Sequence, residues 1–200
     1  MWVYCSIKGA QNPIRQFVYQ PGRSRKYPQS HLEGYHGFIH TDAYKGYEKV
    51  TGITRCICWS HLRRYFVDAL PKDINRPDAT IPATAIKYIN HLFEIENKLE
   101  VLSPEGRKEQ RLIQEKPVLD AFWLWVEESA PKVLPSSKLG KAFTYAYNQK
   151  AGLMNYLKAG TAAFQITWRK IAFVLLQLAE RTGCSLAVPK EPRQVLVYTL

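Results

Sequence analysis

The stretch Gly37-Phe38-Ile39-His40-Thr41-Asp42-Ala43-Tyr44-Lys45-Gly46-Tyr47 says the most about how this chain folds. Its first part, Gly37 to Asp42, is predicted to be a β-strand that ends on a carboxylate. A carboxylate held rigidly at the end of a strand and facing solvent suits a divalent cation such as Mg²⁺. The alternative is that Asp42 caps the following helix through its side-chain oxygen.

Further strands are predicted on both sides of this stretch. The runs Trp2–Ile7 and Ile14–Tyr19 are rich in β-forming residues, and the short turn between them predicts an antiparallel hairpin. The polar residues 24–34 leave room for a helical turn. After the quoted stretch, Ile53–Trp59 is predicted to be another strand, and Ser60–Leu70 a helix.

From about residue 81 the pattern changes to helix. Apolar residues recur at helical spacing in the first predicted helix, and Ser103-Pro104-Glu105 is a typical helix start. Two more helices are predicted, through Val118–Val126 and over Leu139–Leu157. Four aromatic residues of this region have core-like spacing, so we expect them to pack and not to stack on bases: Trp123, Trp125, Tyr145 and Tyr147.

The last forty residues have a different texture. Ile171–Ala179 is almost entirely apolar and follows neither helical nor strand periodicity, and a proline-dotted stretch comes after it. We therefore expect an α/β fold with a sheet-forming region at 1–78, a helical region at 79–160 and an irregular C-terminal tail at 161–200.

Composition narrows the class of protein. The chain has 200 residues, 46% apolar and 22% charged, which is typical of a soluble globular protein. It has no long apolar run and no leader-like N-terminus, and its four cysteines favour reduced thiols. These features predict a cytoplasmic protein without a membrane partner.

The charge balance points to a polyanionic partner. The formal net charge is +11, and the pI is about 9.5. Such an excess of Lys and Arg attracts nucleic acid, because each neutralised phosphate releases counterions. The alternative is a basic protein of some other function. We expect DNA, and no small-molecule substrate.

Two groups of basic residues are candidates for phosphate contacts. Arg23, Arg25 and Lys26 lie in a predicted loop after Pro21-Gly22, and Arg63 and Arg64 lie on a predicted helix. Adjacent helical residues diverge by about a quarter turn, so one of the two arginines should face solvent. The alternative for both groups is ordinary solvated surface.

Cys56, Cys58 and His61 lie close together in the sequence and could be imagined as zinc ligands. A fourth ligand at ordinary spacing is missing, so buried thiols at the end of a strand are the preferred interpretation.

Several motifs in register resemble the central part of the insertion-sequence-66 family of transposases. They are MWVY, VYQPGRS, GFIHTDAYKGY and CWSHLRRYF, followed by LSPEGR and LGKAFTYAYNQ in the helical region. The resemblance covers residues 1 to about 160.

This resemblance implies a ribonuclease-H-like mixed sheet with an Asp, Asp, Glu set that binds divalent metal, Mg²⁺ or Mn²⁺, for DNA cleavage and strand transfer. Asp42 matches the second acid, as a catalytic residue and a metal ligand. The first acid belongs to a strand, central to the sheet, that precedes MWVY and is absent here. The third acid is expected after the glycine matching Gly160, in an Asn-Asn-Leu-Ala-Glu motif. Here that region reads Gln165–Lys170, and Glu180 is a weak alternative that lies too far along the chain.

We hypothesise that a frameshift near Gly160 to Gln165 replaced the helix that carries the third acid. Codons for Asn-Asn-Leu-Ala-Glu-Asn-Arg-Ile-Arg-Pro-Phe, read one base late with a suitable choice of synonymous codons, spell Ile166–Leu175. Codons for a family-like continuation spell Leu176–Leu186 in the same way. Residues translated out of frame were never selected for packing, which also explains the unpatterned tail.

The sequence therefore predicts a transposase fragment that is catalytically inactive, since two of the three acids are missing. The alternative is a non-catalytic basic DNA-binding protein that interferes with an intact transposase copy. A third possibility is a marginally stable, pseudogene-like relic without function.

Overall fold

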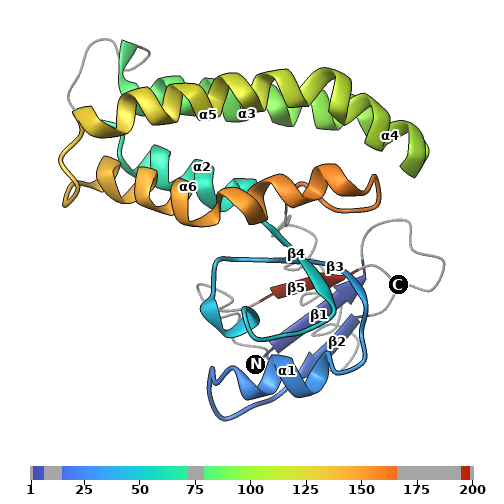
Figure 1. Ribbon diagram of the computed structural model, residues 1–200. Coiled ribbons are helices and arrows are strands. Elements are labelled where there is room, and N and C mark those ends of the chain that lie inside the picture. Colours follow the sequence, from blue (N-terminus) through green and yellow to red (C-terminus); the bar gives the residue numbers. More distant parts are fainter. Residues whose placement is uncertain (1, 7–14, 72–78, 166–194, 199–200) are drawn as a thin grey trace, which may run out of the picture. The chain divides into compact units, whose positions relative to one another are not determined.

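The computed structural model describes residues 2–6, 15–71, 79–165 and 195–198, which form a mixed α/β structure as predicted (Figure 1). The chain divides into two compact units. The sheet unit comprises Met1–Thr54 and Gln165–Leu200, and the helical unit comprises Arg55–Phe164. The helix predicted at Ser60–Leu70 belongs to the helical unit, although we had placed it with the sheet-forming region.

The sheet has five strands in the order β2-β1-β5-β3-β4. β1 (Trp2–Ser6) and β2 (Arg15–Val18) form the predicted antiparallel hairpin, with Trp2 opposite Val18. β3 (Gly37–Thr41) and β4 (Ile53–Ile57) form the other side. β4 ends before Trp59, which begins a helix instead of ending the strand as we had expected.

The central strand comes from the end of the chain. β5 (Val195–Tyr198) runs parallel to β1, with Val3 opposite Val195, and antiparallel to β3, with His40 opposite Val197. The expectation of an irregular tail is therefore wrong for these four residues. Their β-branched and aromatic composition suits a strand that is paired on both sides. Residues 166–194, including Glu180, lie outside the described part of the chain.

Aromatic side chains dominate the core of the sheet unit. Trp2 and Tyr4 are two residues apart in β1 and therefore share one face of the strand. Both are buried, in a cluster with Leu32, Ile39 and Tyr47. The short helices α1 (Lys26–His31) and η1 (Lys45–Tyr47) border this cluster.

The helical unit contains four longer elements in two layers (Figure 1). One layer holds α2 (Trp59–Asp68) and α6 (Lys138–Met154), and the other holds α3 (Ile81–Leu99) and α5 (Lys116–Ser129). Shorter elements connect or extend these helices: α4 (Pro104–Gln110), the π-helical turn η3 (Arg111–Glu115), η4 (Ala130–Lys132) and η5 (Asn155–Lys158). The helices predicted from sequence are thus present, and Thr80, Ser103 and Ser137 cap α3, α4 and α6 through their side-chain oxygens. No described helix is long and apolar enough to cross a membrane.

Trp59 anchors the core of the helical unit. Its ring is fully buried against Phe122 and Phe164, and its indole N–H donates to the carbonyl of Leu153 at 2.9 Å. Trp123 is buried, as expected. Tyr147 is 43% exposed, so the prediction that it packs in the core is wrong, because helical spacing alone did not show that it lies at the edge of the apolar stripe.

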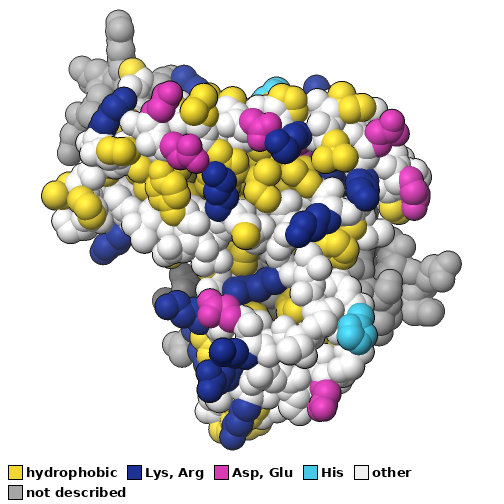
Figure 2. All heavy atoms as spheres, viewed as in Figure 1, with side chains coloured by type: hydrophobic (Ala, Val, Ile, Leu, Met, Phe, Trp, Pro, Cys, Tyr) yellow, Lys and Arg dark blue, Asp and Glu magenta, His cyan; other side chains and the backbone are white. Residues whose placement is uncertain are grey.

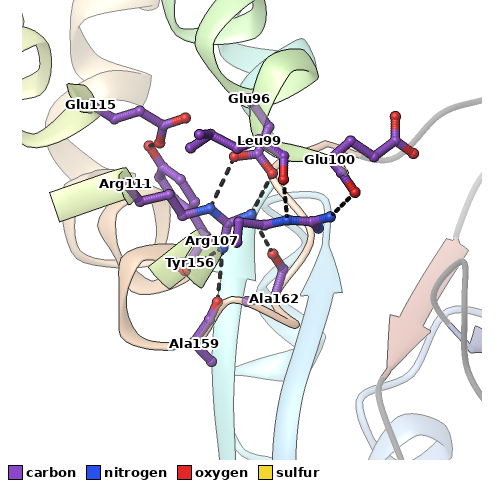
Figure 3. Close-up of polar contacts among 9 residues, drawn as sticks. All are labelled: Glu96, Leu99, Glu100, Arg107, Arg111, Glu115, Tyr156, Ala159 and Ala162. Atoms are coloured by element: carbon purple, nitrogen blue, oxygen red, sulfur yellow. Dashed lines mark hydrogen bonds and ion pairs between the residues drawn. The ribbon is translucent and has the colours of Figure 1, made fainter. Parts of the chain in front are cut away.

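A buried arginine, Arg111, connects helix α3 with the segment 156–162 at the end of the helical unit (Figure 3). Arg111 is fully buried and pairs with Glu96 of α3, with Nε 2.9 Å from Oε2. Its remaining N–H groups donate to three carbonyl oxygens, those of Tyr156, Ala159 and Ala162. One side chain thus satisfies three backbone acceptors in the segment 156–162.

Glu115 lies at the other end of the same π-helical turn and is also fully buried. The hydroxyl of Tyr156 donates to its Oε2 at 2.6 Å. Burial, assisted by the neighbouring Glu96 carboxylate, raises the pKa of Glu115 to about 8, although Tyr156 and Arg111 act in the opposite direction. Gly160 closes the loop where no side chain fits, because a Cβ there would lie 1.6 Å from the carbonyl oxygen of Pro104.

Candidate nucleic-acid interface

Asp42 follows β3 directly, at the place that the sequence predicts. Its side-chain Oδ1 accepts a hydrogen bond from the backbone N–H of Tyr44 at 3.0 Å, which closes a tight turn. The next helical element, η1, has no side-chain cap. Asp42 therefore shapes the turn before the helix instead of capping the helix, which was the alternative interpretation. The residue is partly exposed.

Of the predicted basic loop, Arg23 lies beside this turn, whereas Lys26 begins α1 instead of lying in the loop. Arg23, Arg25 and Lys26 are all exposed, and Lys and Arg side chains gather on the visible face of the sheet unit (Figure 2). The guanidinium of Arg23 lies 4.8 Å from the ring centre of Tyr44, and the Tyr44 hydroxyl donates to the Arg23 carbonyl oxygen. Lys26 lies over the ring of Tyr27.

Tyr44 connects the acid with the basic loop. Its backbone N–H contacts Asp42, and its ring and hydroxyl contact Arg23. Trp2 contacts both Tyr44 and the chain next to Arg23. Its ring packs edge to face on the Tyr44 ring with 6.3 Å between the ring centres, and its indole N–H donates to the carbonyl oxygen of Gly22 at 3.4 Å. A cationic loop fixed in this way loses less conformational entropy on binding than a free one.

Sequence reasoning missed the role of Tyr44. A signal was present in Gly46, two residues further on, whose Cβ would lie 2.2 Å from Tyr44 Cε1. The glycine leaves room for the tyrosine ring, but a lone glycine in a sequence does not say which neighbour needs the space.

The surroundings of Asp42 do not form a metal centre within the described residues, where no group of three or more His, Cys, Asp or Glu residues could hold an ion. Both strands that flank β3 lack acidic residues: β4 reads ITRCI and β5 reads VLVY. One carboxylate that already accepts a backbone N–H is a poor site for Mg²⁺, which prefers several oxygen ligands. The residues that the structure describes therefore do not fit the metal site that the resemblance implies.

The other predicted candidates lie in the helical unit. Arg64 is exposed, whereas Arg63 donates from Nε to Asn90 at 2.8 Å, so one of the adjacent arginines faces solvent as expected. Cys56 and Cys58 are buried thiols, as preferred, and burial raises the pKa of Cys56 to about 12.

In comparison with known protein families, residues 1–165 match a DDE-type transposase domain. The chain belongs to the family described as "Transposase IS66 family". Members of this family carry out DNA transposition, bind DNA and generally use divalent metal ions.

The curated relatives come from Sinorhizobium fredii (strain NBRC 101917 / NGR234). Uncharacterized protein y4hP is 28% identical over 179 residues, and uncharacterized protein y4qI is 27% identical over 177 residues. In each case the match covers 80% of this chain and 32% of the relative, so the chain spans about a third of their length. No solved structure matches the chain.

Proposed function

We propose that this chain acts as a DNA-binding portion of a transposase and does not cut or join DNA by itself. The observation that carries the proposal is the arrangement around Tyr44, which holds an exposed cationic loop against the Asp42 turn, next to strands without a second acid. Family membership supports DNA as the partner. It also supports a ribonuclease-H-like ancestry for the sheet.

The chemistry of the described residues agrees with binding more than with cleavage. Two-metal cleavage of a phosphodiester needs several carboxylates around the ions. Asp42 contributes one carboxylate and uses one of its oxygens for the Tyr44 amide. Exposed Arg and Lys, in contrast, need no further partner to contact phosphates.

Asp42→Asn tests the proposal with the full chain. We expect the wild-type chain to bind duplex DNA and not to nick it with Mg²⁺ or Mn²⁺, and we expect the variant to bind DNA equally well or slightly better. Loss of charge at Asp42 removes only a repulsion from phosphate. Metal-dependent nicking that disappears in the variant would overturn the proposal and restore a catalytic role for Asp42.

The basic loop requires its own variant. Arg23→Gln, Arg25→Gln and Lys26→Gln together should weaken DNA binding and reduce the salt dependence of log Kd by about 2 to 3, because each lost phosphate contact reduces the slope by about 0.9. Unchanged binding would show that these residues are ordinary solvated surface.

A non-catalytic binder of this kind has a second consequence. Occupation of DNA ends, or of the oligomer interface of an intact transposase copy, would reduce transposition by that copy. Co-expression with an intact family member tests this: we expect fewer transposition events with the wild-type chain than with the triple loop variant. Equal frequencies would leave DNA binding in place and remove the interfering role.

We also propose that the residues after 165 are translated out of frame. The family match ends at residue 165, and the out-of-frame interpretation of the sequence begins at Ile166. The nucleotide sequence that encodes residues 155–200 tests this directly. An alternate frame that encodes Asn-Asn-Leu-Ala-Glu is expected; without it the frameshift idea fails, and Glu180 becomes the candidate third acid.

A further inference from the structure

The two layers of the helical unit carry different charges. α2, α6 and η5 together hold six Lys or Arg residues and one acid, Asp68. The elements α3, α4, η3 and α5 hold six Lys or Arg residues and eight acids. The positive charge of this unit is therefore concentrated on the α2–α6 layer.

Two lysines at the start of α6 occupy electrostatically unfavourable positions. Lys138 and Lys141 lie in the first turns of a helix that has no acid in its first turn. The helix dipole is positive at this end, so a cation there lowers helix stability. Both lysines are exposed, and the ion pairs found in the described residues of this unit use other lysines, Lys116 and Lys150. The stability of the fold therefore does not account for a lysine at either position.

The packing of α2 on α6 brings a third exposed cation, Arg64 of α2, to the same layer. The helices run antiparallel, because Trp59 contacts Leu153 whereas Phe66 contacts Phe143. Between these points Tyr65 stacks on Tyr145 at 4.5 Å.

Lys138, Lys141 and Tyr145 follow helical i, i+3, i+7 spacing and share a face of α6. Arg64, exposed on α2, precedes the stacked Tyr65, which is itself 41% exposed.

We propose that this face, defined by Arg64, Tyr65, Lys138, Lys141 and Tyr145, is a second contact surface for the backbone of duplex DNA. The proposal rests on the DNA-binding function proposed above and extends it to the helical unit. Exposed cations can contact backbone phosphates, and the two tyrosines stack on each other instead of offering open ring faces, which favours a duplex over a single strand.

The test compares two matched pairs of substitutions in the full chain, with a short fluorescent DNA duplex at several salt concentrations. Lys138→Gln with Lys141→Gln removes two charges from the proposed face. Lys98→Gln with Lys108→Gln removes two exposed charges from the α3–α4 side. We expect the first pair to weaken binding on the order of tenfold near 0.1 M salt and to reduce the salt slope by about 2, with little change for the second pair.

Two further readouts separate the causes. Asp68→Asn removes the single acid of the layer and should strengthen binding. The Lys138→Gln, Lys141→Gln variant should melt no lower than wild type, because it removes cations from the positive end of a helix. Weaker binding therefore cannot be attributed to unfolding.

Three outcomes would overturn the inference. Equal weakening by both lysine pairs would mean that only net charge matters. If DNA binding were weakened by the triple loop variant but not by the Lys138→Gln, Lys141→Gln variant, the proposed function would stand and this second surface would be ruled out. Binding to anionic lipid vesicles but not to DNA would overturn both the proposed function and the second surface.

Discussion

At the scale of single residues, the buried carboxyl of Glu115 makes the stability of the helical unit depend on pH. Arg111 and Glu115 lie at the two ends of the π-helical turn, and both are fully buried. A buried carboxyl with a pKa raised from 4.5 to about 8 holds its proton in the folded chain and releases it on unfolding.

Glu115→Gln is therefore predicted to flatten the pH dependence of stability. Between pH 4.5 and 8 the folded chain binds this proton more tightly than the unfolded chain, so the free energy of unfolding falls as pH rises. At pH 8 the variant should be more stable than wild type, by on the order of 4 kcal/mol, with little difference near pH 4.5. Urea titrations at several pH values measure this, and Glu109→Gln on the exposed face of α4 is the control. A constant difference at all pH values would contradict the assignment.

Gly46 is predicted to matter through the ring of Tyr44. Gly46→Ala would place a Cβ 2.2 Å from Tyr44 Cε1, so the ring must leave its position against Arg23. We expect a lower melting temperature and DNA binding that is severalfold weaker. Gly22→Ala is a matched control, because a Cβ at Gly22 meets nothing within 4 Å. Equal behaviour of the two variants would show that Tyr44 does not position the loop.

At the scale of elements, the sequence predicts most helices and strands but not how they combine. The hairpin, the Asp42 strand and the capped helices follow from local composition and periodicity. The position of β5 does not, because four residues such as Val195–Tyr198 can pair with any open strand edge. The link from Arg23 through Tyr44 to Asp42 was also beyond prediction, since it depends on contacts between residues about twenty positions apart.

The central strand is testable by proline. Val197→Pro removes a backbone donor from a strand that is paired on both sides, and we expect a loss of about 1–3 kcal/mol or more, because a carbonyl oxygen of a neighbouring strand loses its partner. Hydrogen exchange of the β1 and β3 amides should become faster, while α3 and α5 stay protected. Val197→Ile, which keeps β propensity, serves as the control. Unchanged exchange in β1 and β3 would show that the sheet does not need β5.

At the scale of the whole molecule, the excess of eleven positive charges predicts binding that is strongly sensitive to salt. If both basic surfaces contribute, combining the triple loop variant with the Lys138→Gln, Lys141→Gln pair should reduce the salt slope by about 4 to 5, roughly the sum of the two separate effects. Fluorescence anisotropy between about 50 and 200 mM salt measures the slope. A combined effect no larger than either alone would indicate that the two surfaces do not act on the same bound state.

The uneven distribution of charge in the helical unit has a consequence for motion as well as for affinity. A body that has a net positive charge on one layer and a net negative charge on the other has a permanent electric dipole moment. In the field around a DNA duplex such a body experiences a torque, which turns the α2–α6 layer toward the phosphates before any contact forms. Orientation during the approach would raise the fraction of collisions that succeed, a benefit to the association rate that even distribution of the same charges would not provide.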